Sequence, residues 1–198
     1  MIDNLDYKGS NKLISDYYNM NTLETTKMFT VILFSFIYGY SFYKDVDCYR
    51  SFILVNNISR TKYMISKIFV LFLISFVFVL LIVFAHYLIP MFYKVYINIK
   101  KIYIFINIIV LINYYGLLSI FLIQVTDNIY ICLLPIFIYI LINSIILNIS
   151  NDVIKILGYF VLTIINFEII HSIYYGLLIL LMLIFINVLV FNYRDLQN

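Results

Sequence analysis

The sequence predicts an all-α protein that crosses a membrane several times. Apolar residues make up 65% of its 198 residues and charged residues 12%, whereas soluble domains have about 45–50% and about 25%. The mean hydropathy is +1.03. One soluble core cannot hide this much apolar surface. The apolar runs also lack the strict alternation of a transmembrane barrel, so the spans are predicted to be helices.

Residues 1–27 form a polar N-terminal segment without the basic-then-apolar pattern of a signal peptide. The next uncharged interval, 28–43, would measure about 24 Å as a helix. That is slightly short of a bilayer core, so Lys27 and Lys44 are expected to snorkel toward the two surfaces. Residues 28–43 are therefore the first predicted span.

Longer uncharged intervals follow, each able to cross a bilayer with some tilt. The remaining predicted spans are 68–93, 102–126, 128–151 and 169–193. Residues 156–167 are too short to cross and are predicted to form a re-entrant or interfacial helix, a half-crossing. The sequence thus predicts five crossings and one half-crossing in a single transmembrane domain.

Packing between these helices is expected to depend on Ile, Leu, Phe and Tyr, with Ser and Asn hydrogen bonding between helices. No two of the five glycines form a GxxxG pair, so close glycine-mediated pairing is not expected. Tyrosines near span ends are expected to form the interfacial belt. These are Tyr38, Tyr40, Tyr43, Tyr87, Tyr93, Tyr130 and Tyr193.

The composition also limits the chemistry. A net charge of +3 does not indicate nucleic-acid binding. The chain has no GxxxxGK[ST] loop and no HExxH motif, so we expect no ATP site, no catalytic residues, no metal and no cofactor. Cys48 and Cys132 lie in different segments without ligand spacing and are expected to be ordinary thiols. Heavy use of Ile, Asn, Tyr and Lys favours a bacterial source, and hence the plasma membrane.

Residues 44–67, between the first two spans, hold five of the thirteen basic residues. Tyr49, Phe52 and Ile53 share one helical face, which predicts a short amphipathic helix. Asn57 or Ser59 can cap a second helix that continues into the next span. The simplest interpretation is an ordinary cytoplasmic loop; the alternative is a docking element for a cytoplasmic protein.

Two cations in this segment, Arg60 and Lys62, would lie in the first turn of that second helix. There the helix dipole opposes each cation by about 0.3–1 kcal/mol. Anionic headgroups or an acidic groove on a partner could offset this cost. Basic residues divide almost equally between the two sides of the predicted topology, so charge alone does not decide the orientation.

The order of residues around this segment resembles the ABC-2 type permease family. The similarity runs through Tyr38-Gly39, Phe42, Asp45 and Asp47, then Asn57-Ile58-Ser59-Arg60-Thr61-Lys62-Tyr63 and Lys67. The ending from Phe191 to Asp195 and the half-crossing before the last span are similar too. The resemblance covers roughly residues 28–198. The family's first span has no counterpart before Met28, and Asn57 stands where the family usually has Pro.

What the resemblance implies is a membrane-spanning subunit of an ATP-driven exporter. Residues 45–62 would dock on a separate nucleotide-binding ATPase subunit, with the loop facing the cytoplasm. The implied coupling residues are Asp45, Asp47, Arg50, Phe52, Arg60, Lys62, Lys67 and Asp127. The subunit would work as a homodimer or with a sister permease, among membrane lipids, and would move an amphipathic or hydrophobic peptide, antibiotic or lipid.

Other interpretations remain open at this stage. The alternative is a non-transporting immunity, accessory or scaffold protein; an intramembrane enzyme is disfavoured because catalytic groups do not cluster. Glu168 and His171 are three residues apart and could pair at the outer rim. Asp127 is expected either to cap the helix that follows it or to form a second cytoplasmic contact.

Overall fold

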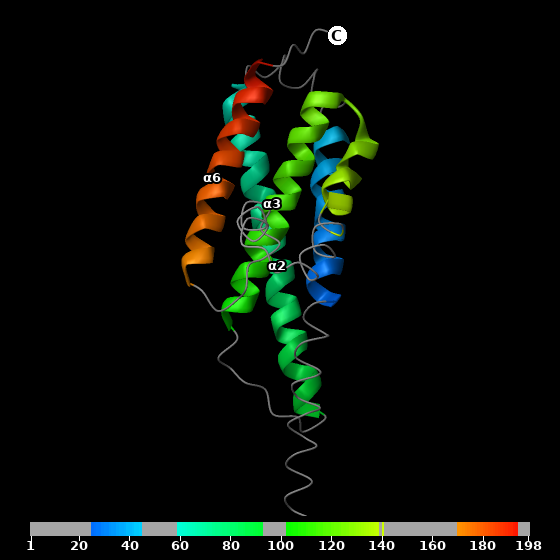
Figure 1. The fold of residues 1–198 in the computed structure, drawn as a ribbon, viewed down its shortest axis with the longest axis vertical. Coiled ribbons are helices and arrows are strands. Elements are labelled where there is room, and N and C mark those ends of the chain that lie inside the picture. Colours follow the sequence, from blue (N-terminus) through cyan, green and yellow to red (C-terminus); the bar gives the residue numbers. More distant parts are fainter. Residues whose placement is uncertain (1–24, 45–58, 93–101, 139, 141–169, 194–198) are drawn as a thin grey trace, which may run out of the picture.

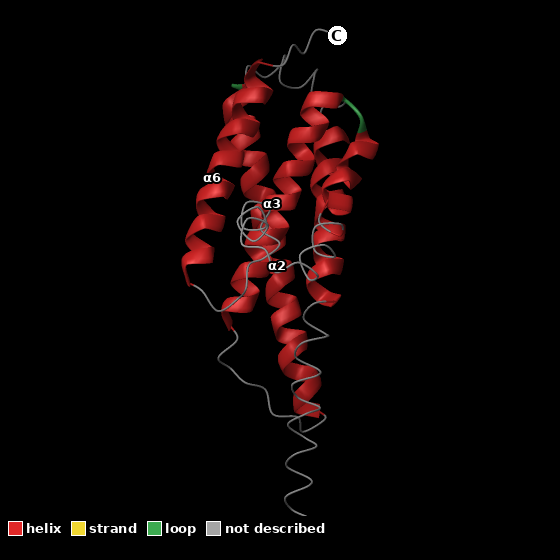
Figure 2. Ribbon diagram, viewed as in Figure 1, coloured by secondary structure: helices red, strands yellow, loops and turns green. Residues whose placement is uncertain are grey.

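The computed structural model describes residues 25–44, 59–92, 102–138, 140 and 170–193. Within these ranges every residue is helical except Ser59, Asp127 and Asn128, and none is in a strand (Figure 2). The predicted all-α class is therefore confirmed for the described residues. The elements are helix 25–44, α2 (Arg60–Phe92), α3 (Ile102–Thr126), η2 (Ile129–Leu133) continuing as helix 134–138, and α6 (Ile170–Tyr193).

Three of the described helices are long and apolar enough to cross a membrane. Their apolar stretches are Arg60–His86, Phe105–Thr126 and Gly176–Tyr193. By length and composition this is a helical membrane protein. Helix 25–44, which contains the predicted span 28–43, is not among the three. The predicted half-crossing lies outside the described residues, as does most of 128–151, so the count of five spans stays a prediction.

The start of α2 follows from its cap. The Ser59 hydroxyl accepts a hydrogen bond from the Lys62 amide at 3.4 Å, and the Tyr63 amide donates to the Ser59 carbonyl at 3.1 Å. These bonds satisfy amide donors that the first turn of a helix leaves without partners. Of the two caps considered from sequence, Ser59 is the one used. Residues 60–67 are consequently helical and continuous with the span that follows, as expected of the second helix in the predicted coupling loop 44–67.

At the centre of the bundle lies α3 (Figure 1). Of its apolar stretch 72% is buried, against 22% for α2 and for α6. The outer helices therefore bury one stripe each and leave the remaining apolar surface for lipid. On α2 the buried residues are four or three positions apart, so they lie on one face of the helix. They are Met64, Ile68, Leu71, Ser75 and Val79.

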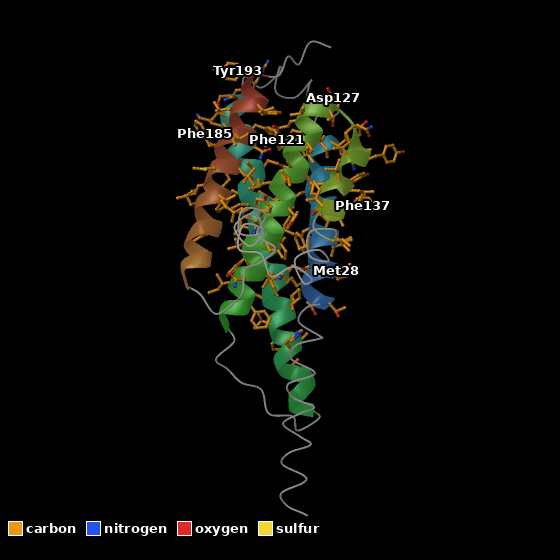
Figure 3. The ribbon with its side chains drawn as sticks, viewed as in Figure 1. Met28, Phe121, Asp127, Phe137, Phe185 and Tyr193 are labelled. Atoms are coloured by element: carbon orange, nitrogen blue, oxygen red, sulfur yellow. The ribbon has the colours of Figure 1, made fainter. Side chains whose placement is uncertain are left out.

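Helix 25–44, α3 and α6 run in one direction and α2 runs in the other (Figure 1). Contacts along the helices agree: Ser75 of α2 meets Asn113 of α3, whereas Met64, earlier in α2, meets Gln124, later in α3. Residue 44 and Arg60 consequently lie at the same end as Asp127 and Tyr193. Figure 3 shows Asp127 and Tyr193 at this end and Met28 farther toward the other.

Two single glycines allow helix 25–44 to approach its neighbours closely. A Cβ on Gly116 would lie 2.5 Å from Cδ1 of Tyr38, and one on Gly39 would lie 2.6 Å from Cβ of Cys132. Real Cβ atoms are not found so close to other heavy atoms. The expectation of no close glycine-mediated packing was wrong, because each contact uses one glycine facing a side chain on another helix, rather than a GxxxG pair.

Candidate functional site

The described residues of the predicted coupling set lie at one end of the bundle. Arg60 and Lys62 occupy the first turn of α2, and Lys67 lies seven residues after Arg60. Asp127 lies between α3 and η2 (Figure 3). We call this end the charged end, and Lys44, the last residue of helix 25–44, belongs to it too. The structure therefore brings together the ends of three helices at this face.

Several predicted site residues lie outside the described part of the chain. They are Asp45, Asp47, Arg50, Phe52 and Glu168. His171 lies in the first turn of α6, but its side chain is not described. The predicted pair of Glu168 and His171 therefore stays a prediction.

Arg60 reaches across to α6. Its guanidinium Nη1 donates a hydrogen bond to the carbonyl oxygen of Asn192 at 3.2 Å, 132 residues away in the sequence. Asn192 is in the last described turn of α6, toward the end at which the helix dipole is negative. The first turn of α2 disfavours the positive charge of Arg60. The same charge lies beside the C-terminal turn of α6, where the dipole favours it. For Arg60, the cost of lying at the start of α2 is therefore offset by a contact within the chain.

Thr61, the next residue, binds the side chain of the same asparagine. Asn192 Nδ2 donates to Thr61 Oγ1 at 3.0 Å, and the Thr61 hydroxyl donates to Asn192 Oδ1 at 3.3 Å. Together with the bond from Arg60, three hydrogen bonds join the first turn of α2 to Asn192.

Aromatic rings extend this contact into the bundle. The Phe191 ring centroid lies 5.9 Å from that of Phe42, in an edge-to-face arrangement, and 5.8 Å from that of Tyr63. Phe42 and Phe191 are both buried. Ring pairs at these separations contribute about 0.5–1.5 kcal/mol beyond their burial.

We call this set the three-helix junction, since it joins helix 25–44, α2 and α6. Its members are Phe42, Arg60, Thr61, Tyr63, Phe191 and Asn192. The sequence motif contained most of these residues but did not predict that they meet. The one available signal was Asn192, a polar residue at the end of the long apolar run of α6.

Asp127 has a structural role other than the expected cap. Its φ is 57°, in the left-handed region, and its amide donates to the Ile123 carbonyl at 2.9 Å. This geometry ends α3, and Asp adopts it more readily than most residues. The cap of η2 is Asn128, whose side chain accepts from the Tyr130 amide at 2.9 Å. The capping interpretation of Asp127 was therefore wrong, while its exposed carboxylate belongs to the charged end.

A buried polar cluster lies deeper in the bundle. Asn113 Oδ1 accepts hydrogen bonds from the Tyr38 hydroxyl and, at 3.1 Å, from the Ser75 hydroxyl. Its amide nitrogen donates to the Ile109 carbonyl at 2.7 Å. This cluster joins helix 25–44, α2 and α3. Tyr38 is fully buried in it, so its expected place in the interfacial belt was wrong.

Further hydrogen bonds join α3 to its neighbours, as the Ser and Asn content predicted. Asn187 of α6 donates to the Leu117 carbonyl of α3 at 3.2 Å, and the Ser119 hydroxyl donates to the Cys132 carbonyl at 3.2 Å. The buried polar residues of the described interior are all neutral amides and hydroxyls. Cys132 is buried and forms no disulfide, and no group of three potential metal ligands occurs within the described ranges.

Comparison of the chain with protein-family models, with curated proteins and with solved structures finds no match.

Proposed function

We propose that this chain is the membrane-spanning permease subunit of an ATP-driven exporter of the ABC-2 type, with five crossings and one half-crossing. A separate ATPase subunit docks on residues 45–62. The observation that supports this most is the charged end. The helix ends that flank residues 45–58 lie there together with Asp127 and the end of α6. A partner bound to this loop would therefore face Asp127 as well, as the family resemblance implies.

Docking of an ATPase on residues 45–62 requires a cytoplasmic position for this end. Of the described basic residues, Lys44, Arg60, Lys62 and Lys67 lie at this end and Lys27 lies toward the other. Lys44 and Lys62 are exposed and available to a partner or to lipid headgroups. The proposed location is the bacterial plasma membrane, with the ATPase on its inner side.

The interior suggests the class of substrate. An ionised group would be costly to bury among apolar side chains and neutral amides without an opposite charge. The described interior therefore favours an amphipathic or hydrophobic cargo, such as a peptide, an antibiotic or a lipid. We propose that the subunit pairs with a second copy or a sister permease.

The test is co-purification with an ATPase from detergent-solubilised membranes of the source cells. Lys44→Glu with Lys62→Glu should lower recovery of the ATPase by about tenfold or more, because like charges across an interface cost several kcal/mol. Arg60 is unsuitable for this test because it binds Asn192. Lys27→Glu is the matched control, since it reverses a charge near the other end of helix 25–44.

Two results would argue against the transporter. One is a wild-type complex that contains no nucleotide-binding subunit; the other is recovery that the double reversal leaves unchanged. Either result would favour the alternative, a non-transporting immunity, accessory or scaffold protein.

A further inference from the structure

Three asparagine side chains are buried in the described interior, and one of them differs from the other two. Asn113 and Asn187 each donate to the carbonyl four residues earlier, at 2.7 and 2.8 Å, and each is also hydrogen bonded to another helix. Asn187 leaves only its Oδ1 without a partner. Asn107 is 2% exposed, yet neither its Oδ1 nor its Nδ2 has a hydrogen-bond partner among the described residues.

Asn107 lies toward the end of α3 that is opposite the charged end, and on one side of that helix. It is nine residues, about two and a half turns, before Gly116, which faces Tyr38 of helix 25–44. Asn107 is therefore on the side of α3 that faces away from helix 25–44. Phe121, fourteen residues after Asn107 and on nearly the same side, lies toward α6 in Figure 3. The side of Asn107 is thus the side on which α3 packs against α6.

An amide without partners is costly at this position. Asn107 lies within the apolar stretch Phe105–Thr126, and its neighbours Ile108 and Val110 are buried. A polar group taken out of water without a new hydrogen bond lowers stability, and a bilayer supplies no water to replace that bond. A buried polar group that lowers stability and bonds to nothing within the described chain is typical of a binding site in its free form.

The chemistry of the Asn107 side chain indicates what it can bind. Its amide offers an acceptor and a donor side by side. An extended peptide offers the complement, because the N–H and C=O of one residue point toward the same edge of the chain. The other buried polar residues of the described interior are neutral, so a charged ligand group would find no opposite charge among them. Ile106, the preceding residue, is 44% exposed, so Asn107 lies one residue from the lipid-facing surface.

We propose that Asn107 binds the main-chain amide of an uncharged, apolar peptide that enters from the lipid beside α3 and α6. The proposal narrows the class of ligand to molecules that carry a neutral amide among apolar groups. The identification of this peptide as exported cargo rests on the proposed function, whereas the binding itself does not require an ATPase.

The probe for this site is N-decanoyl-leucine N-methylamide, whose leucine offers one N–H and one C=O. Its ester counterpart has oxygen in place of that N–H and nearly the same shape. The protein is held in detergent micelles with Cys48→Ser, and thermal unfolding is followed by thiol-reactive fluorescence at buried Cys132. The rise of the unfolding midpoint with the concentration of each probe gives its affinity, since a ligand that binds the folded state stabilises it by mass action.

The amide probe should bind about tenfold more tightly than the ester, because the ester leaves the Oδ1 of Asn107 without a donor. Equal affinities of the two probes, or no binding of the amide, would contradict the proposal. This comparison changes no buried residue of the bundle apart from the probe's own surroundings, so it does not depend on whether a variant folds.

Asn107→Leu supplies the second measurement. Without a probe it should raise the unfolding midpoint by about 2 °C or more, since it removes a buried amide that has no partner. It should also bind the amide and the ester equally. A lower midpoint for Asn107→Leu would show that the amide is satisfied within the chain and would reject the site.

Asn187→Leu is the matched control. It removes an amide of the same size that is hydrogen bonded to the carbonyls of Leu117 and Leu183. Its unfolding midpoint should therefore fall, while its preference for the amide probe over the ester should stay. Loss of the preference in Asn187→Leu together with its retention in Asn107→Leu would place the binding group elsewhere and contradict the proposal.

Failure of the proposed function has a separate signature. If no ATPase is recovered with the chain but the preference for the amide depends on Asn107, the site stands and only its role in export falls. If the ATPase is recovered but the preference is missing, the exporter stands and the site does not.

Discussion

At the scale of single residues, the bundle depends on a few polar or small side chains within an apolar majority. Asn113 accepts from hydroxyl groups on two other helices, and Gly116 leaves room for the ring of Tyr38. The hydropathy pattern predicted buried Asn and Ser residues but not their partners. It also placed Tyr38 at a surface, because a tyrosine near a span end is usually interfacial.

The polar cluster should contribute measurably to stability. Asn113→Leu should lower the free energy of unfolding in micelles by about 1–2 kcal/mol, since two buried hydroxyls lose their shared acceptor. Ser75→Ala should cost about 0.5–1.5 kcal/mol. Unfolding can be followed by thiol-reactive fluorescence at buried Cys132 in a Cys48→Ser background. Ser66→Ala, at an exposed position of α2, should change stability by less than about 0.5 kcal/mol.

The close approach at Gly116 predicts a change of unusual sign. Ala in place of Gly normally stabilises a helix by about 0.5–1 kcal/mol. Gly116→Ala should instead lower stability by about 1–3 kcal/mol, because its Cβ would overlap the Tyr38 ring. In a Tyr38→Ala background the same change should cost much less. A stabilising effect of Gly116→Ala in the wild-type background would show that the helices are farther apart.

At the scale of elements, the sequence predicted best what depends on local chemistry. The uncharged interval 102–126 has the same bounds as α3, and Ser59 caps α2 as its hydroxyl allowed. The junction could not be predicted in the same way, because its hydrogen bonds join residues more than 130 apart in the sequence. Such contacts depend on how the helices are arranged, which the pattern of charge and hydropathy does not specify.

The pairing of α2 with α6 can be tested by cross-linking. In a background without native cysteines, Thr61→Cys with Asn192→Cys should be joined by a short bifunctional thiol reagent, since the native Thr61 Oγ1 and Asn192 Nδ2 atoms are 3.0 Å apart. Ser66→Cys with Asn192→Cys is the control pair, with one cysteine at an exposed position farther along α2. Cross-linking of the control pair as rapid as that of the test pair would contradict the arrangement at the junction.

At the scale of the whole molecule, the directions of the described helices place most of the described charged residues at one end. Asp127 and Tyr193 lie at this end (Figure 3), and the helix directions place Lys44 and Arg60 there too. Counting basic residues left the orientation open, because the two predicted sides carry almost equal numbers. The proposed docking of an ATPase requires this face to be cytoplasmic.

Cysteine accessibility in bacterial cells tests that requirement most directly. Single cysteines are placed at Thr25, Tyr130 and Tyr193, all exposed, in a background without native cysteines. A membrane-impermeant maleimide should label residue 25 in intact cells, and residues 130 and 193 only in inverted vesicles. Labelling of residues 130 and 193 in intact cells, with residue 25 protected, would place the charged end outside and contradict the proposed function.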